Sequence, residues 1–328
     1  MSDLPELQAL RASAVLAGGA GHDVVRATGN DRVSFLHRIT SGKVAGTEPG
    51  QGCRTLLLDV RGRVLASLLV FVRGKSVRLI VPGGQGADIV AGLSKYAIMD
   101  DFQIVLEPEL ATLAVLGPQA ARALADVGVP TLPSLLEAPR YAHAEAASES
   151  YGPLWIAHGR ANGMDGLCVA AGKAARDALA QALLDRGTPR LSQEIAEALR
   201  IAAMEPKPGN EITPDRFPVE IGLGADIDHS KGCYVGQETI VRMRDRGIIR
   251  KRLVLLRLAG ESTPAPGDKL VALDQSVGQI TSVGCLPGER PLALAILAAA
   301  IPVGAVVQIQ HADAPLDAEV AAESRPWG

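Results

Sequence analysis

The chain of 328 residues is poor in aromatic side chains, which make up only 3% of it. Proteins that hold single-stranded nucleic acid stack its bases on aromatic rings, so this shortage argues against such a role. The formal net charge of -3 also lacks the positive balance that binding to a phosphate backbone requires. We therefore expect no nucleic-acid partner.

Metal-ligand motifs and membrane segments are missing as well. The cysteines form no C-x-x-C pair, so no zinc or iron–sulfur ligand set is visible and no metal site is expected. The first residues carry neither a signal-peptide nor a transit-peptide pattern, and no apolar run is long enough to span a membrane. These features predict a cytoplasmic protein with reduced thiols. The four cysteines are Cys53, Cys168, Cys233 and Cys285.

The length and the 47% of hydrophobic residues predict two or three domains with large cores. Strands over 64–72, 77–81 and 102–106, with a helix after Pro82, indicate an α+β unit with a mostly antiparallel sheet, and a similar theme follows from 112 to 184. A capped helix is predicted over 192–204. Beyond Arg252, short strands separated by Gly and Pro predict a small β-barrel.

These patterns predict two domains. Residues 1–246 would form two α+β subdomains, and residues 247–328 the barrel. The Pro- and Ala-rich stretch 130–151 is expected to be a long surface connection. The last residues, 312–328, are expected to be loosely ordered.

Residues 231–238 read Lys-Gly-Cys-Tyr-Val-Gly-Gln-Glu and precede a predicted helix over 239–246. The two glycines predict a tight turn around Cys233. A helix N-terminus and the ammonium group of Lys231 would both favour the thiolate form. The alternative is a small buried cysteine that is chemically inert. His229 is a candidate base for this thiol, although a histidine in an exposed turn is the commoner case.

The run from Lys231 to Arg252 is rich in basic side chains. Such a run could hold a small polyanion, for example a polyglutamate tail or a phosphate, and the alternative is a solvated face. Arg242 is one candidate ligand, but Glu238 lies one helical turn before it and is a ready ion-pair partner.

The octapeptide resembles the K-G-C-Y-x-G-Q-E signature of the YgfZ-type folate-binding proteins, which are relatives of the glycine-cleavage T-protein. Other stretches resemble T-protein motifs in the same order. They are Arg61-Gly62-Arg63, the Gly-Met-Asp-Gly turn at 163–166, the Arg-Ile, Gly-Asn-Glu-Ile and Pro-Val-Glu stretches between 200 and 220, and the barrel segments 250–253 and 278–282. The resemblance implies ferredoxin-like antiparallel-sheet units around a central cleft, a small C-terminal β-barrel, and tetrahydrofolate or a derivative as cofactor.

Two departures from the T-protein pattern bear on activity. The T-protein's D-D-L stretch, whose aspartate serves aminomethyl transfer, corresponds to Ala66-Ser67-Leu68, and neither Ala66 nor Ser67 supplies a carboxylate. The glutamate that contacts the pterin ring corresponds to Met164, whose thioether offers no paired acceptor. We therefore do not expect an active aminomethyltransferase.

The YgfZ-type resemblance implies assembly or repair of iron–sulfur clusters in client enzymes, with iron–sulfur clients or assembly factors as partners. Cys233 would be the reactive thiol, with Lys231 beside it. One thiolate cannot hold a [4Fe–4S] cluster, which needs about four ligands, so any contact would be transient or shared. The candidate folate contacts are Arg200, Glu220, Asp165, Tyr234, Gln237 and Arg242.

Three alternatives remain open at this point. The chain could be a tetrahydrofolate-dependent one-carbon transferase of the T-protein type. It could be a protein-binding module, in which Cys233→Ser would change nothing. The octapeptide could also be a structural hinge between the folate-binding region and the barrel.

Overall fold

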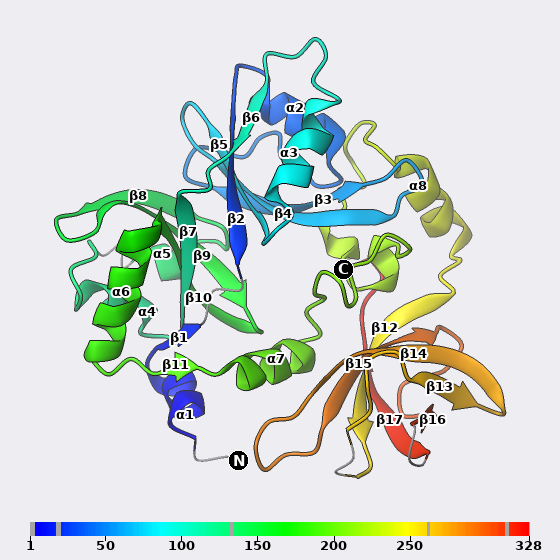
Figure 1. The fold of residues 1–328 in the computed structure, drawn as a ribbon. Helices are drawn as coiled ribbons and strands as arrows, with labels where there is room; N and C mark the ends of the chain where they lie inside the picture. Colours follow the sequence, from blue (N-terminus) through cyan, green and yellow to red (C-terminus); the bar gives the residue numbers. More distant parts are fainter. Residues whose placement is uncertain (1–3, 18–20, 131–133, 261–262, 312–314, 328) are drawn as a thin grey trace.

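The computed structural model describes residues 4–17, 21–130, 134–260, 263–311 and 315–327. Three parts surround the middle of the molecule in Figure 1: a five-stranded sheet, a six-stranded sheet and a closed barrel. Helices cover one face of each sheet. The predicted α+β class with antiparallel sheets and a C-terminal barrel is therefore confirmed.

The first part is an antiparallel sheet with the strand order β3-β4-β5-β2-β6. Leucine, valine and phenylalanine side chains fill the core between this sheet and its two helices, because alternate residues of each strand face them. The predicted strand over 64–72 is present with those bounds. The elements are β2 (His22–Thr28), α2 (Arg32–Ile39), β3 (Gly52–Leu58), β4 (Val64–Val72), β5 (Val77–Pro82), α3 (Gly86–Ser94) and β6 (Gln103–Leu106).

The second part has the strand order β11-β1-β7-β10-β9-β8, antiparallel except for the parallel pair β1–β11. The elements are α1 (Pro5–Ala12), β1 (Val15–Ala17), β7 (Leu110–Leu116), α4 (Ala120–Ala125), α5 (Ser134–Glu137), β8 (His143–Ser148), β9 (Gly152–Ala161), β10 (Met164–Gly172), α6 (Lys173–Asp185) and β11 (Arg190–Leu191). The interpretation of 130–151 as a surface connection is wrong for residues 134–151, because they contain α5 and the edge strand β8, while residues 131–133 lie outside the described residues. The strand buries His143 and Ser148 at its two ends.

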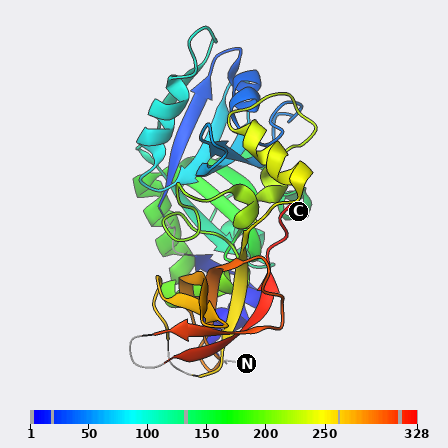
Figure 2. The ribbon, with the colours of Figure 1, turned by 90° about the vertical axis from the view of Figure 1, so that its right-hand side faces the viewer.

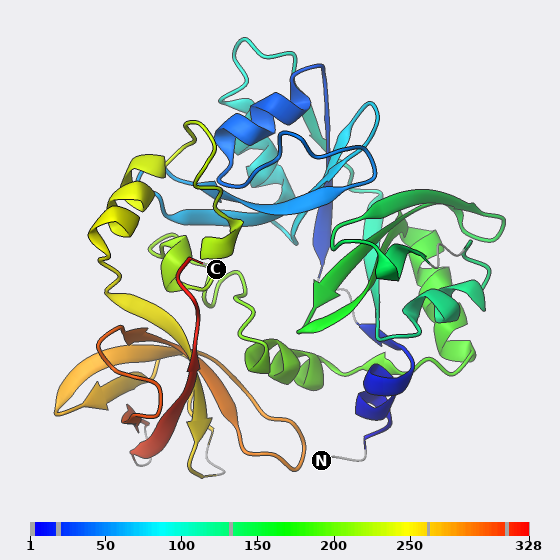
Figure 3. The same cartoon turned by 180° about the vertical axis from the view of Figure 1, so that it is seen from behind.

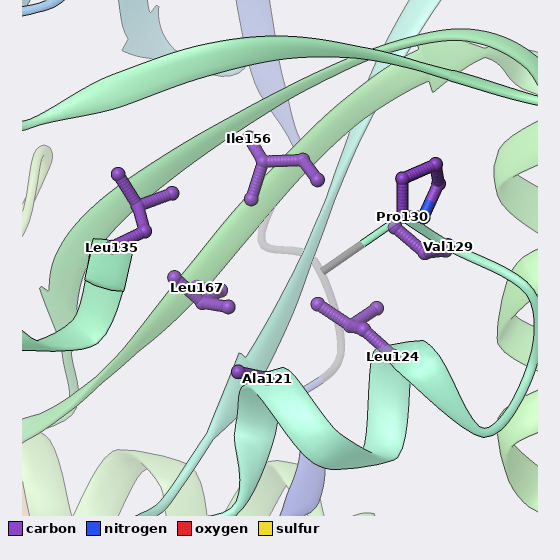
Figure 4. Close-up of a pocket in the computed structure, with 7 residues that line it drawn as sticks. All are labelled: Ala121, Leu124, Val129, Pro130, Leu135, Ile156 and Leu167. Carbon is purple, nitrogen blue, oxygen red and sulfur yellow. The ribbon is translucent and has the colours of Figure 1, made fainter. Parts of the chain in front are cut away.

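A small apolar cavity lies inside the second part, between α4, α5 and the sheet (Figure 4). Its volume is about 10 Å³, which is the size of a single water molecule. The lining side chains are all apolar, so the cavity offers a ligand no polar contact. We regard it as a packing defect.

A long connection joins the second sheet to the barrel. It begins with α7 (Gln193–Ala202), where Ser192 Oγ accepts a hydrogen bond from the Ile195 amide at 3.4 Å, as the predicted cap requires. Two 3₁₀ turns follow, η1 (Pro218–Glu220) and η2 (Gly224–Asp226), and then α8 (Gln237–Arg246).

The barrel closes in the order β12-β15-β14-β13-β16-β17. Its strands are β12 (Lys251–Leu258), β13 (Lys269–Ala272), β14 (Gln275–Gly284), β15 (Leu292–Ala298), β16 (Val306–Gln310) and β17 (Leu316–Glu323). The first of them begins at Lys251, and the predicted domain boundary at 246/247 stays a prediction.

The expectation that 312–328 is loosely ordered is wrong for the described residues 315–327; residues 312–314 and 328 lie outside them. Strand β17 pairs with both β12 and β16. The chain after it returns to the middle of the molecule (Figure 3), where a Cβ on Gly224 would lie 1.7 Å from the Pro326 carbonyl oxygen. Figures 2 and 3 show α8 and this C-terminal end on the same side of the molecule.

Helix α8 is attached to the first part through two glycines. Gly236, the residue before the helix, has φ 81°. A Cβ on Gly236 would lie 2.4 Å from the Asp59 carbonyl oxygen and 2.8 Å from Gly62 Cα, so only glycine fits against the β3–β4 hairpin. This contact joins the predicted Arg61-Gly62-Arg63 hairpin to the octapeptide.

Gly236→Ala should therefore destabilise the protein by at least about 3 kcal/mol, because an unfavourable φ and a backbone clash add together. Gly247→Ala is the matched control: Gly247 also has positive φ, 61°, but a Cβ there meets nothing within 4 Å. We expect the control to cost about 1–2 kcal/mol. Urea unfolding of both variants measures the difference, and equal losses would show that the glycine contact contributes nothing.

Candidate functional site

Lys231 ties the octapeptide to the first part of the molecule. Its ammonium group donates hydrogen bonds to the carbonyl oxygens of His37, Thr40 and Gly42, the last two at 2.6 and 2.9 Å. Carbonyl groups at the end of a helix such as α2 need donors, and Lys231 supplies them. Burial lowers the pKa of Lys231 to about 8. The hydrogen bonds of this ammonium group thus go to the end of α2 and the residues just after it, and its predicted effect on Cys233 stays a prediction.

Three other predicted site residues of this region differ in exposure. Tyr234 is 8% exposed in an apolar cluster, and burial raises the pKa of its hydroxyl to about 12. Its ring lies 5.3 Å from the Lys231 ammonium group. Gln237 is half-buried as the first residue of α8. Arg242 is exposed and forms an ion pair with Glu238 at 2.5 Å, the partner expected from the sequence.

The four cysteines fall into two groups. Burial raises the pKa of Cys53 to about 11 and that of Cys168 to about 12, so both are held as thiols near neutral pH. Cys233 and Cys285 are exposed. The Cys285 thiol donates to the carbonyl oxygens of Leu286 and Glu289, at 3.3 and 3.1 Å. Among the described residues, the exposed Cys233 thiol has no hydrogen-bond partner.

His229, the candidate base for Cys233, is exposed, and its ring packs against Trp327 with the centroids 5.4 Å apart. Burial lowers its pKa. The histidine therefore holds the C-terminal end beside the octapeptide loop.

Arg200, one of the candidate folate contacts, is buried on α7. Its five N–H groups are all used: two bind Glu197, one binds the Glu205 carbonyl oxygen, and two reach Glu211 at 3.1 Å and Ser282 at 2.7 Å. Ser282 belongs to β14, so the guanidinium group joins α7 to the barrel. Its predicted role as a folate contact stays a prediction, and a ligand would have to displace one of these partners.

Glu220 and Asp165 lie in contrasting surroundings. The Glu220 carboxylate is buried and accepts the Phe217 amide at 3.2 Å, and burial raises its pKa. Asp165 is exposed and pairs with Arg140 at 3.4 Å. Met164 packs against the apolar cluster beneath α1 and α7. The structure therefore gives Met164 a packing role where the T-protein pattern has its pterin contact.

A second group of side chains meets between the two sheets and the 3₁₀ turns, and the sequence analysis missed it. Arg54 on β3 forms an ion pair with Asp226 of η2 at 2.8 Å. Burial raises the pKa of Asp226, although Arg54 opposes this shift. Tyr141 is an electrostatic neighbour of Arg54, Asp226 and Cys53, and burial raises the pKa of its hydroxyl. We name Arg54, Asp226 and Tyr141 the central triad.

The backbone of Tyr141 supports a functional interpretation of the central triad. Its φ of 71° is uncommon for a bulky residue, and such strain concentrates at functional sites. The strained residue is held by a hydrogen bond from its amide to the His158 carbonyl at 2.9 Å. In the sequence, the available signal was a single arginine, Arg54, inside an otherwise apolar strand.

The substituted D-D-L stretch lies on β4. Ala66 is 1% exposed in the core beneath α2 and α3. Ser67 is half-buried and, by strand alternation, shares the opposite face with Leu69 and Phe71, which pack between the two sheets. A carboxylate at position 66 would lie in an apolar core. A side chain at position 67 instead lies on the face of β4 that is turned toward the second sheet.

The described residues contain no cluster of three or more His, Cys, Asp or Glu side chains that could hold a metal ion. Within the same described ranges, no helix is long and apolar enough to cross a membrane.

Two known proteins are similar in sequence to most of this chain. It is 26% identical to a chloroplastic protein of Arabidopsis thaliana described as a transferase, over 79% of this chain and 59% of that protein, so it spans about three fifths of that relative's length. It is 26% identical to the aminomethyltransferase of Bacillus subtilis strain 168, over 84% of this chain and 77% of that protein.

A solved structure agrees with the fold. The glycine cleavage system aminomethyltransferase T from Bartonella henselae superposes with a TM-score of 0.87 at 24% identity, covering 97% of this chain and 88% of that one. At this identity the likeness concerns the fold. Residues 3–231 match the family described as the GCVT N-terminal domain, well over half of the sequence, and the chain therefore belongs to that family.

Proposed function

We propose that the protein is a folate-binding accessory factor of the YgfZ type, which supports assembly or repair of iron–sulfur clusters through Cys233. The observation that carries this proposal is the exposure of Cys233 within its motif. Lys231, Tyr234 and Gly236 are each accounted for by hydrogen bonds or packing. The Cys233 thiol has no such structural role among the described residues, so chemistry is the remaining reason for its presence.

The central triad fits a folate-type cofactor. An aminopyrimidine edge pairs best with two acceptor oxygens, and a buried carboxylate such as that of Asp226 offers them. Arg54 would keep this carboxylate ionised, and the Tyr141 ring offers an apolar face for a pterin. When bound, such a cofactor would supply a carrier for one-carbon units. The half-buried ion pair Arg54–Asp226 would bind and orient it.

An exposed thiol suits transient contact with a partner. The thiolate is both the nucleophile and the metal ligand of cysteine, and one ligand cannot retain a cluster alone. We therefore assign Cys233 to a shared or short-lived contact with an iron–sulfur client or assembly factor. A reduced thiol requires a reducing compartment, and we propose the cytoplasm.

Aminomethyl transfer to tetrahydrofolate is the second candidate, and the names of the relatives favour it. Ala66 and Ser67 argue against it, because neither provides the carboxylate that the T-protein pattern places there. Turnover separates the two candidates, since both include folate binding.

Labelling by iodoacetamide at pH 7.5 should modify Cys233 far faster than Cys53 or Cys168. With a pKa of about 11, the Cys53 thiolate fraction is below ~1 in 1000, and burial also blocks access. Peptide mass spectrometry gives the rates, and labelling in urea, where all four should react alike, is the control. Comparable native rates at Cys53 and Cys233 would contradict the assignment of Cys233 as the accessible thiol.

Asp226→Asn should weaken tetrahydrofolate binding by about tenfold or more, because an amide replaces one acceptor oxygen by a donor. Asp177→Asn is the matched control on an exposed carboxylate of α6 and should bind like the wild type. Isothermal titration under anaerobic conditions measures both, and thermal melting confirms that Asp226→Asn remains folded. The central triad is refuted as the folate site if Asp226→Asn binds tetrahydrofolate as tightly as Asp177→Asn and the wild type do.

A strain that carries Cys233→Ala should lose activity of its cluster-containing enzymes under oxidative load. The matched control is Cys285→Ala, which removes another exposed thiol and should behave like the wild type. Assays of several such enzymes in extracts give the readout, alongside immunoblots of protein level. If the cluster-containing enzymes are as active in the Cys233→Ala strain as in the wild type, Cys233 is not required and the proposed function through this cysteine is refuted.

A further inference from the structure

An open groove lies where the β4–β5 hairpin meets the start of β8. Its volume of about 370 Å³ is within the range of small-molecule sites. The hairpin residues Arg73 to Ser76 form one wall and His143 to Glu145 form the other. None of the residues of the central triad lines it, so the groove is a separate place on the molecule.

Positive charge gathers at this groove. Arg73 and Lys75 line it, and the one acidic side chain among its lining residues is Glu145, which forms an ion pair with Arg73. Behind the hairpin, Arg78 and Arg26 share a single carboxylate, that of Glu107, at 3.4 and 2.9 Å.

The strands bring these guanidinium groups into one row. Arg26 on β2 pairs with Arg78 on β5, and Arg78 pairs with Phe71 on β4, two residues before Arg73. Residues two apart on a strand share a face, so the row crosses three strands and ends at the groove. Only two carboxylates, those of Glu145 and Glu107, pair with this group of cations. The four cations are Arg73, Lys75, Arg78 and Arg26.

Burial makes this excess of charge costly. Arg78 is 8% exposed, and its Nε has no hydrogen-bond partner among the described residues. Burial lowers the pKa of Arg78, and the positive charge of Arg73 lowers it further. Burial likewise lowers the pKa of Arg73. A buried charge is stabilised by a counter-ion, and the protein supplies too few of them here.

The wall formed by β8 is fixed and neutral. Trp155 Nε1 donates to His143 Nδ1 at 3.0 Å, so the proton of His143 is assigned to Nε2, which donates to the Val72 carbonyl at 2.9 Å. Burial lowers the pKa of His143, which keeps the ring neutral. The positive charge of the groove wall therefore comes from Arg73 and Lys75.

We propose that this groove binds the phosphate or carboxylate groups of an anionic small molecule. Arg73 and Lys75 hold the anion directly, and Arg78 contributes its charge from behind. In the absence of the ligand, Glu145 forms an ion pair with Arg73. This ion pair breaks when the ligand binds to Arg73. Charge-assisted contacts of this kind suit both phosphate and carboxylate oxygens.

Isothermal titration of the full chain with pyrophosphate and with tri-γ-glutamate tests the proposal and distinguishes the two sources of anion. Arg73→Gln and Lys75→Gln should each weaken binding by about tenfold, and Glu145→Gln should strengthen it several-fold because Arg73 loses its competitor. Circular dichroism confirms that each variant is folded.

Lys269→Gln is the matched control, since it removes the same charge from an exposed position on the barrel. It should leave the affinity unchanged. The proposal is overturned if neither anion binds the wild type, or if Lys269→Gln weakens binding as much as Lys75→Gln does. The outcome is independent of folate binding, because no residue of the central triad is altered.

Discussion

The buried contact between Arg200 and Glu211 is the interaction on which the arrangement of the site depends. Glu211 is fully buried, so its charge must be compensated within the protein. It receives Arg200 at 3.1 Å and the Ser282 hydroxyl at 2.6 Å. Removing any one partner would leave a buried charge or donor unpaired, which is among the costly changes a core can suffer. Helix α7, the turn-rich connection and the barrel are therefore held as one assembly.

This assembly determines where the central triad lies. The connection held by Glu211 continues into η2, which carries Asp226 to Arg54 on the first sheet. The same connection then enters the octapeptide, where Lys231 closes the end of α2 and Gly236 packs against the β3–β4 hairpin. The motif thus combines two residues that attach it to the first part of the molecule, Lys231 and Gly236, with an exposed thiol. Both readings of the octapeptide considered from the sequence, a structural joint and a functional cysteine, are compatible with this geometry.

Much of the fold could be predicted because its signals are local. Alternating apolar residues predict strand β4, and the N-cap serine predicts the start of helix α7. The glycines and prolines between the barrel strands separate them in the sequence. Strand β8 was missed because its alanines do not show an apolar alternation, and its structure comes from pairing with β9. Strand β17 does alternate between apolar and polar residues from Leu316 to Val320, so the expectation of loose order overlooked a local signal; its place is set by closure of the barrel.

The site was less predictable because its contacts are long-range. Two of the partners of Arg200, Glu211 and Ser282, lie 11 and 82 positions away, so helix periodicity could not show that this arginine is buried. The pair Arg54–Asp226 joins two parts of the chain that share no motif. By contrast, Cys233 and Arg242 could be placed from local sequence, because a turn and a one-turn ion pair are near-neighbour features.

Strand β12 lies between β15 and β17, so one of its edges is covered only by the last strand of the chain. A ribosome adds roughly 5–20 residues per second, and β17 therefore leaves it several seconds after β12. During that interval the nascent chain carries an unpaired strand edge, which is a template for mispairing with other chains. Chaperone demand during translation should accordingly be highest between the synthesis of β12 and that of β17.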